Sequence, residues 1–380
     1  MDSKKYNNTK LFFSISKGIT SFLLIFIFVY SGLSLRTEEY ISLYVGNKYL
    51  ELIVFVFATG FAGAVIFAPV NFYTDYYLEH KYNLSNQTFL KWMWEGFKAL
   101  LVSSAIGIPI LLLFFYSINK FGNNWWLPFA FALFIISVIL ARVLPVIVLP
   151  LFYKITPIEN EELISRIKIL ARDAGINVDN VFKFNMSKNT KKANAAFTGL
   201  GKSKRILLGD TLLDQYTEDE IETVIAHELG HYKRKHIIKN IFIGTVSSFL
   251  TLFLVAFLYS HSIAWFNFNS ISEIAALPLL VLWMIILGLF QAPITNIISR
   301  KFEYEADEYA ISSTRKTGAF ISTLEKLTEQ NLGDKNPHPF VEWFFYSHPS
   351  INKRIEAIKK FAASIDDEDP QENNLNYQGS

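Results

Sequence analysis

The stretch Thr217-Glu-Asp-Glu-Ile-Glu-Thr-Val-Ile-Ala-His227-Glu228-Leu-Gly-His231 contains the pattern His-Glu-x-x-His. Thr217 is followed three residues later by Glu220, which is typical of a capping box, so we predict that a helix begins here. In that helix His227 and His231 are four residues apart, which places their imidazoles on one face. Two imidazoles at this spacing can bind one Zn2+, with Glu228 beside the ion as a base that takes a proton from water. The stretch therefore predicts a zinc site, and the alternative is a solvated amphipathic helix with incidental histidines.

The composition around this stretch is that of a membrane protein. Of the 380 residues, 51% are hydrophobic and only 18% are charged, and the apolar residues gather in long uncharged runs. The formal net charge is +2 and no basic stripe is present, so nothing in the sequence favours nucleic-acid binding. Cysteine is absent, which excludes disulfides and thiolate ligands. Any zinc must therefore be held by histidine and carboxylate side chains.

Six apolar runs are long enough to cross a membrane. The first follows a basic leader, and we expect an uncleaved span and not a signal peptide, because no small-x-small cleavage site follows. The predicted spans are 19–35, 52–69, 99–118, 125–151, 241–259 and 275–298.

Charged residues beside and within these runs predict how the spans are oriented in the membrane and single out Arg142 as a candidate functional residue. The loop 260–272 contains no Lys or Arg, whereas the N-terminus, residues 153–240 and the Arg300-Lys301 pair are basic, so the positive-inside rule places these three in the cytoplasm. Arg142 interrupts the fourth run, and a charge at that depth usually faces the bundle interior or a water-filled cavity. The alternative is that Arg142 lies near the interface and extends its charged end into water.

The segment between the fourth and fifth runs has the composition of a soluble domain. A helix is predicted over 160–174, a strand over 178–184, and a hairpin from the runs 193–199 and 205–209. The exposed edge of the hairpin could take a peptide as an added strand, and the alternative is that the hairpin only supports the metal helix. We expect the metal helix to run on to Asn240 and into the fifth span.

The chain is therefore predicted to have five parts. The last is an acidic tail that we expect to be disordered. The parts are a four-span N-terminal membrane domain (1–152), a catalytic domain with the hairpin and the metal helix (153–240), a two-span hairpin (241–298), a C-terminal catalytic segment with the third ligand (299–363) and the tail (364–380).

A catalytic zinc site needs a third protein ligand, and its candidates are His236, Glu303, Glu305 and His348. His236 is five residues beyond His231, which turns it off the ligand face, so it is expected at a helix end or on the surface. Glu303 and Asp307 form an i, i+4 pair, so one can bind the metal while the other orients a ligand imidazole. The alternative is an ordinary solvated acidic face. Two spans separate this pair from His227, so both stretches are expected on the same side of the membrane.

Several blocks together make the sequence similar to one family, the type I CAAX prenyl proteases, over about Tyr40 to about Phe361. These are integral-membrane zinc metalloendopeptidases of the gluzincin kind. The blocks are Asn194-Ala195, Lys204-Arg-Ile-Leu-Leu-Gly-Asp210-Thr-Leu-Leu213, His227-Glu-Leu-Gly-His231, Ser299-Arg-Lys-Phe-Glu303-Tyr-Glu-Ala-Asp307 and Ser347-His348-Pro-Ser-Ile-Asn-Lys-Arg354.

The resemblance implies a mainly α, polytopic membrane protein with about six transmembrane helices around a chamber, and a small α/β gluzincin-type catalytic domain that holds one Zn2+. The family has seven spans and we count six, so one span is expected to be missing near the N-terminus. The resemblance implies that the zinc ligands are His227, His231 and Glu303, that Glu228 is the base, and that Asp307 is the partner of a ligand histidine. It also implies that His348 donates to the oxyanion, with Arg354 beside it at the site. The substrate-binding edge strand would contain Asn194, Ala195 and Ala196.

Three functions remain open at this point. The first is an endopeptidase that removes the last three residues after a prenylated Cys, and the second is a quality-control protease that cuts membrane proteins without a prenyl group. The third is a catalytically silent chamber that binds lipids or lipidated chains. Peptide or protein substrates and membrane lipids are the expected partners, with the site on the cytoplasmic side of the inner or plasma membrane in a bacterium, or of the ER in a eukaryote.

Overall fold

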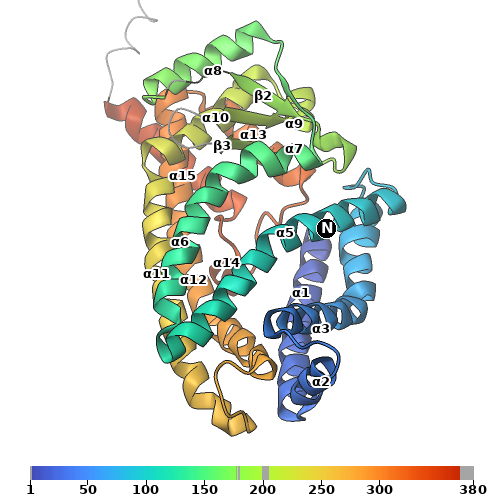
Figure 1. The fold of residues 1–380 in the computed structure, drawn as a ribbon. Helices are drawn as coiled ribbons and strands as arrows, with labels where there is room; N and C mark the ends of the chain where they lie inside the picture. The colour runs from blue at the N-terminus through green and yellow to red at the C-terminus, as the bar shows by residue number, and fades with distance from the viewer. Residues whose placement is uncertain (1, 177, 179, 199–204, 369–380) are drawn as a thin grey trace, which may run out of the picture.

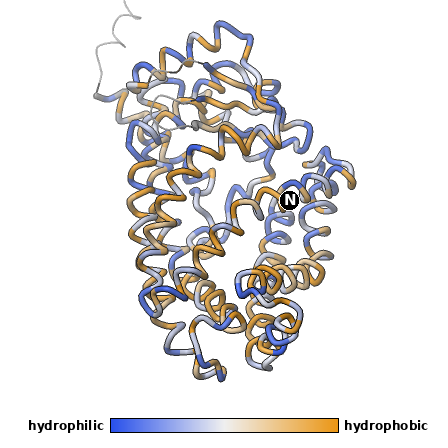
Figure 2. The backbone as a smooth tube through the Cα atoms, viewed as in Figure 1, coloured by the Kyte–Doolittle hydropathy of each residue, from blue (hydrophilic) through white to orange (hydrophobic). Residues whose placement is uncertain are grey.

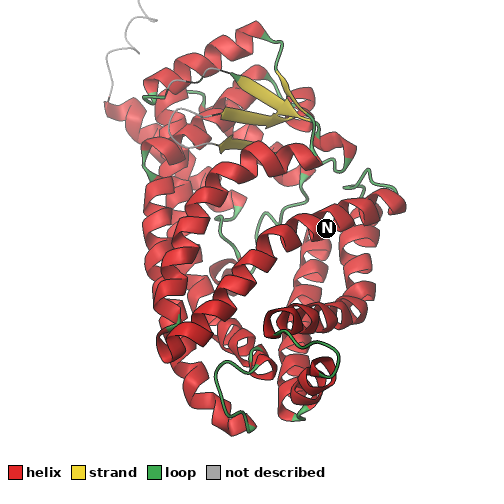
Figure 3. Cartoon of the chain, in the orientation of Figure 1, coloured by secondary structure: helices red, strands yellow, loops and turns green. Residues whose placement is uncertain are grey.

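The structure is a computed structural model that describes residues 2–176, 178, 180–198 and 205–368. Long helices form most of it, and a small sheet lies with several shorter helices at one end (Figure 1, Figure 3). The helices are α1 (Asp2–Tyr30), α2 (Leu33–Ser42), α3 (Lys48–Asn71), α4 (Leu78–Lys81), α5 (Phe89–Phe121), α6 (Trp126–Val143), α7 (Leu149–Phe152), α8 (Glu161–Asp173), α9 (Asp210–Gln215), α10 (Glu218–Lys233), α11 (His236–Ser262), α12 (Pro278–Thr314), α13 (Thr317–Gln330), α14 (Pro339–Phe345) and α15 (Ile351–Glu368).

Six helical stretches in the described part of the chain are long and apolar enough to cross a membrane, as predicted. All but the fourth are longer than the apolar runs that predicted them, because helix continues into polar sequence at their ends. They are Asp2–Tyr30, Lys48–Lys81, Phe89–Asn124, Trp126–Phe152, His236–Phe266 and Ile274–Thr314. Figure 2 shows apolar residues along these helices and a higher share of polar residues around the sheet.

The spans follow one another around a ring and do not form a solid bundle. Helices α6, α11 and α12 lie side by side, α1 to α3 form the opposite side, and α5 crosses between them (Figure 1). In every span but the last, no more than 11% of the most apolar window is buried within the chain. Much of their apolar surface is therefore not covered by the rest of the chain, as expected for helices that face lipid around a chamber. Arg142 lies in the last turn of α6 with an exposed side chain, and its position toward the chamber stays a prediction.

The sheet contains the strands β1 (Ile155–Pro157), β2 (Val181–Phe184), β3 (Ala195–Thr198) and β4 (Arg205–Gly209) in the order β1-β2-β4-β3. Strands β3 and β4 pair antiparallel, with Ala196 opposite Leu207, so the predicted hairpin is confirmed. Its turn, 199–204, lies outside the described residues. Since β3 is last in the strand order, one of its sides has no neighbouring strand among the described residues.

Helix α10 begins as its sequence predicts and ends earlier. Thr217 and Glu220 form the capping box, with Thr217 N–H donating to Glu220 Oε2 at 2.9 Å. The expectation that this helix runs to Asn240 and into the fifth span is wrong. Lys235 has a φ of 59°, a left-handed conformation that ends α10 after Lys233 and lets α11 begin at His236. The chain thus changes direction between the metal motif and the membrane.

The other predicted elements of the soluble part agree with the structure, apart from the tail. Helix α8 begins at the Asn160 cap and is followed by Gly175, whose φ is +80°. Its buried side chains share one core with α10, α12 and α13. Helix α15 continues through Glu368, so residues 364–368 are helical and not disordered as predicted. Residues 369–380 lie outside the described part.

Candidate metal centre

Helices α10 and α12 cross where the His-Glu-x-x-His motif lies. Gly230, inside the motif, permits this crossing, because a Cβ on it would lie 3.0 Å from both Cα and the carbonyl oxygen of Ala306. Leu229 on α10 and Ala306 on α12 are both fully buried. The close approach brings Glu303, one turn before Ala306, up to the two histidines.

His227, His231 and Glu303 form a cluster whose ligand atoms all lie within 4.8 Å of one another. The Nε2 atoms of His227 and His231 are 3.2 Å apart. The carboxylate of Glu303 lies 3.5 Å from His227 Nε2 through one oxygen and 3.4 Å from His231 Nε2 through the other. Two imidazole nitrogens and one carboxylate converging on a point are the donor set of a catalytic zinc site.

The charges and the unpaired atoms of the site fit a bound cation. Glu303 Oε2 is buried and accepts no hydrogen bond from any described residue. Among the described residues, the buried carboxylates of Glu303 and Asp307 pair with one Lys or Arg side chain, that of the largely buried Arg354, which leaves one negative charge uncompensated. Burial lowers the pKa of His227, but Asp307 and Glu303 raise it to about 9, so without a metal a proton would serve as the countercharge. A divalent ion held by His227, His231 and Glu303 would give the oxygen a partner and compensate the charge.

Asp307 contacts both His227 and Arg354. Its Oδ1 lies 2.9 Å from His227 Nδ1, on the side of the ring opposite the ligand nitrogen. Arg354 holds the same carboxylate with two hydrogen bonds, from Nε to Oδ2 at 2.8 Å and from Nη2 to Oδ1 at 2.5 Å. Burial disfavours the charge on Arg354, but Asp307 and Glu303 outweigh it and raise the pKa of Arg354 above its ordinary value. Helix α15, which carries Arg354, is thereby tied to α12 at the metal cluster.

Of the two positions expected for His236, a helix end or the surface, the structure shows the first. It lies at a helix end, as predicted, but it is 1% exposed and not on the surface. Its Nδ1 lies 2.9 Å from His231 Nδ1, and its Nε2 lies 2.9 Å from Glu305 Oε2. Spacing along one helix could not reveal this contact, because the break at Lys235 reorients His236 relative to His231.

Glu228, the remaining charged residue of the motif, lies beside the sheet. It is half-buried and lines a small pocket together with Ala195 and Ala196 of β3. No described residue forms a hydrogen bond or ion pair with its side chain. An unpaired carboxylate beside the edge strand is thus available to water or to a peptide lying there.

The remaining predicted residues lie around this centre with exposed side chains. His348 is 63% exposed, with its Nε2 3.4 Å from Glu303 Oε1. Ser347 Oγ lies 3.0 Å from its Nδ1. Asn194 directly precedes β3, and its carbonyl accepts a hydrogen bond from Gly209 N–H at 2.9 Å. The structure therefore brings all of the predicted site residues to one region, on α10, α12, β3 with the residue before it, and α15 with the segment that leads into it.

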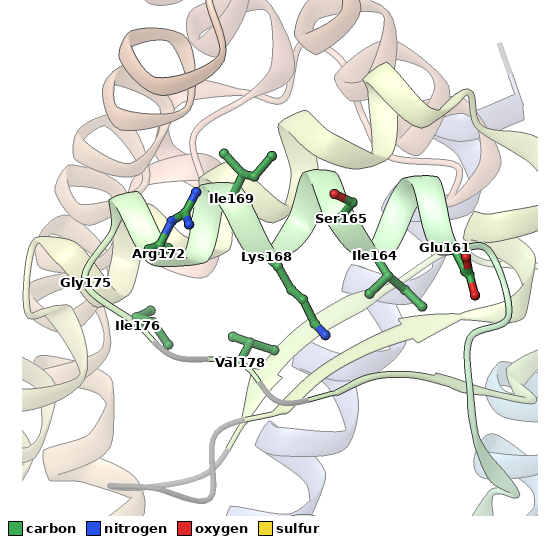
Figure 4. Close-up of a pocket in the computed structure, with 9 residues that line it drawn as sticks. All are labelled: Glu161, Ile164, Ser165, Lys168, Ile169, Arg172, Gly175, Ile176 and Val178. Atoms are coloured by element: carbon green, nitrogen blue, oxygen red, sulfur yellow. The ribbon is translucent and has the colours of Figure 1, made fainter.

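A hollow along α8, drawn in Figure 4, lies apart from this centre. Its lining includes Lys168, Arg172 and Ile176 but none of the predicted site residues. We assign it no part in the metal site.

Comparison with known proteins supports the interpretation of the cluster of His227, His231 and Glu303 as a metal site. Residues 157–362 match the family described as "Peptidase family M48", and residues 1–154 match "CAAX prenyl protease N-terminal, five membrane helices". In the described part of residues 1–154, four helical stretches are long and apolar enough to span a membrane, one fewer than that description.

Three similar proteins extend over most of the chain. The "Uncharacterized metalloprotease YhfN" of Bacillus subtilis is 31% identical over 94% of this chain and 85% of its own. "CAAX prenyl protease 1" of Saccharomyces cerevisiae is 31% identical over 76% of this chain and 68% of its own. The crystal structure of S. mikatae Ste24p superposes with a TM-score of 0.85 at 28% identity, covering 94% of this chain and 88% of that one. With its metal cluster and its six membrane helices, the chain therefore belongs to peptidase family M48 and is an integral-membrane metalloprotease of the Ste24 type.

Proposed function

We propose that this protein is a zinc endopeptidase that removes the C-terminal residues after a prenylated Cys. The observation that carries the proposal is the convergence of His227, His231 and Glu303 next to the unpaired Glu228. The names of the yeast and human relatives, "CAAX prenyl protease 1" and "CAAX prenyl protease 1 homolog", support the substrate class.

The roles of the residues follow from their positions. His227, His231 and Glu303 hold the ion, with His227 oriented by Asp307 and Asp307 held by Arg354. When bound, Zn2+ supplies Lewis-acid chemistry that polarises the scissile carbonyl and lowers the pKa of water. Glu228 takes the proton from the attacking water and delivers it to the leaving amine. His348, exposed beside Glu303, donates a hydrogen bond to the oxyanion.

The edge strand β3 holds the substrate. An extended peptide pairs with the free side of β3, so that backbone hydrogen bonds orient it independently of its sequence. Asn194 begins this edge, and the short side chains of Ala195 and Ala196 let the peptide approach Glu228. The lipid part of the substrate remains in the membrane among the spans.

We assign the site to the cytoplasmic side. The basic N-terminus supports this, since Lys10 on α1 and Lys192 next to β3 both pair with Glu79. Lysines from the start of the chain and from the catalytic domain therefore share one side, while the loop 260–272 without Lys or Arg lies at the other end of α11.

The test uses the purified full chain in detergent micelles or liposomes, with Glu228→Gln as the inactive variant. Each is incubated with a farnesylated CAAX peptide, the same peptide without the lipid, and an unlipidated membrane protein, and metal content is measured by mass spectrometry. We expect about one zinc per chain in both forms, and cleavage of the farnesylated peptide by the unchanged chain alone.

Other outcomes identify the other functions. Equal cleavage of lipidated and unlipidated substrates would assign the protein to quality control. Zinc binding without cleavage of any substrate would leave a silent chamber. The control is Glu308→Gln. Glu308 is half-buried like Glu228 but lies on α12, and this variant should behave like the unchanged chain.

A further inference from the structure

The imidazole of His236 is fixed by contacts on one ring face and at both ring nitrogens. It stacks on the ring of Phe302, with centroids 4.2 Å apart and an angle of 8° between the planes. Its side chain is 1% exposed, and both of its ring nitrogens lie within hydrogen-bond distance of a polar atom. A buried imidazole held on one face and at both nitrogens has a single orientation.

The contacts of this ring define a direction for the protons. Metal ligation through Nε2 of His231 requires the proton of that ring to be on Nδ1, which lies 2.9 Å from His236 Nδ1. His236 Nδ1 must then be the acceptor, so the proton of His236 is on Nε2, where it is donated to Glu305 Oε2 at 2.9 Å. In this series of hydrogen bonds from His231 through His236 to Glu305, every donor meets an acceptor, and the series ends on a carboxylate.

Two basic side chains lie near Glu305, the last residue of this series of hydrogen bonds. Lys239 Nζ lies 3.5 Å from Glu305 Oε2, and Lys301 Nζ lies 4.0 Å from Glu305 Oε1. The carboxylate of Glu305 thus lies next to two basic side chains as well as the ring of His236.

We propose that His236 and Glu305 are positioning residues that hold His231 in the tautomer and orientation that bind the metal. This rests on the proposed metal-binding role of His231. The two ligand histidines are then supported in parallel ways: His227 contacts the carboxylate of Asp307 directly, and His231 reaches that of Glu305 through His236. Because His236 begins α11 and Glu305 belongs to α12, the support also links the metal to the last two membrane spans.

The test measures metal binding and not turnover. The full chain in detergent is stripped of metal, and Zn2+ affinity is measured by competition with a chromophoric chelator for the unchanged chain, His236→Phe, His236→Gln and Glu305→Gln. We expect His236→Phe to raise the Zn2+ dissociation constant about 10- to 100-fold. Gln at this position can accept from His231 and donate to Glu305, so His236→Gln should recover part of the loss. Glu305→Gln should weaken binding in the same direction and by less.

A spectroscopic measurement separates orientation from general stability. The visible absorption of the Co2+-loaded chain reports ligand geometry, and we expect it to change in His236→Phe and to return toward the original in His236→Gln. His261→Phe, an exposed histidine at the far end of the same helix, is the matched control and should change neither measurement.

Each result decides a different point. Unchanged affinity and spectrum in His236→Phe would overturn the positioning role, whereas failure of the unchanged chain to bind Zn2+ would overturn the proposed metal site itself. Thermal unfolding of the metal-free chain shows whether His236→Phe is folded. If it is not, Glu305→Gln against Glu308→Gln decides, and equal affinities would reject the proposal.

Discussion

Gly230 on α10 faces Ala306 on α12 so closely that a Cβ on the glycine would lie 3.0 Å from backbone atoms of the alanine. Gly230 directly precedes His231 and Ala306 lies one turn after Glu303, so the separation of the helices here controls the distance between the ligands. The neighbouring atoms belong to a buried helix backbone and cannot simply rotate away.

Gly230→Ala should therefore force α10 and α12 apart. We expect a loss of about 1–3 kcal/mol in the free energy of unfolding from overpacking, together with weaker metal binding, measured by thermal unfolding and metal titration. Gly244→Ala on α11 is the control, because a Cβ there meets nothing within 4 Å. Equal effects of the two substitutions would show that the helix contact does not limit the site.

Arg354→Met should leave the Asp307 carboxylate buried without its cation. Breaking a buried pair from one side typically costs about 3–5 kcal/mol of stability, and we expect a loss of this size in the metal-free chain. Adding Asp307→Asn to Arg354→Met should restore part of it, because the unpaired charge is then removed. Lys360→Met, on the exposed face of α15, should have little effect. Strict additivity of the two changes would contradict a direct interaction.

His348→Ala should impair turnover without preventing folding, because the side chain is largely exposed. Removal of one oxyanion donor typically lowers kcat by about 10²–10³, with KM and metal content unchanged. Steady-state cleavage of a fluorogenic peptide measures both constants. His261→Ala is the control, and a change in KM alone would assign His348 to substrate binding.

Protonation of the Glu220 carboxylate should make the protein less stable in acid. Burial raises the pKa of its carboxyl, but Lys326, Ser322 and the Thr217 N–H outweigh burial and lower it below the ordinary 4.5. A carboxyl whose pKa is lower in the folded state stabilises the fold above the ordinary pKa, and this stabilisation is lost as pH falls through the folded value. Unfolding measured from pH 6 downward should thus depend less on pH in Glu220→Gln. Glu356→Gln, exposed on α15, should keep the original dependence.

Local patterns in the sequence predicted most of the fold. The apolar runs, the Thr217–Glu220 capping box and Gly175 depend on neighbouring residues only, and the structure agrees with them. The break at Lys235 was not predictable in this way, because a left-handed lysine is not marked by its residue type. A prediction that continued the helix put His236 on the wrong face.

For the site, the spacing of His227, Glu228 and His231 was sufficient to predict two ligands and a base. Spacing alone also offered Glu303 among four candidates for the third ligand, but it could not choose one. That choice depends on where α10 and α12 cross, because the crossing brings Glu303 to histidines more than seventy residues away in sequence, and Gly230 and the membrane hairpin determine it.

The sequence by itself thus determined the elements, their polarity toward lipid and the chemical types of the ligands, because these follow from side chains and their immediate neighbours. Only the tertiary structure decided which carboxylate meets the histidines, that Arg354 holds Asp307, and that His236 lies behind His231. Those contacts join α10, α11, α12 and α15, and such distances between elements result from the packing of whole helices, which no local pattern of residues encodes.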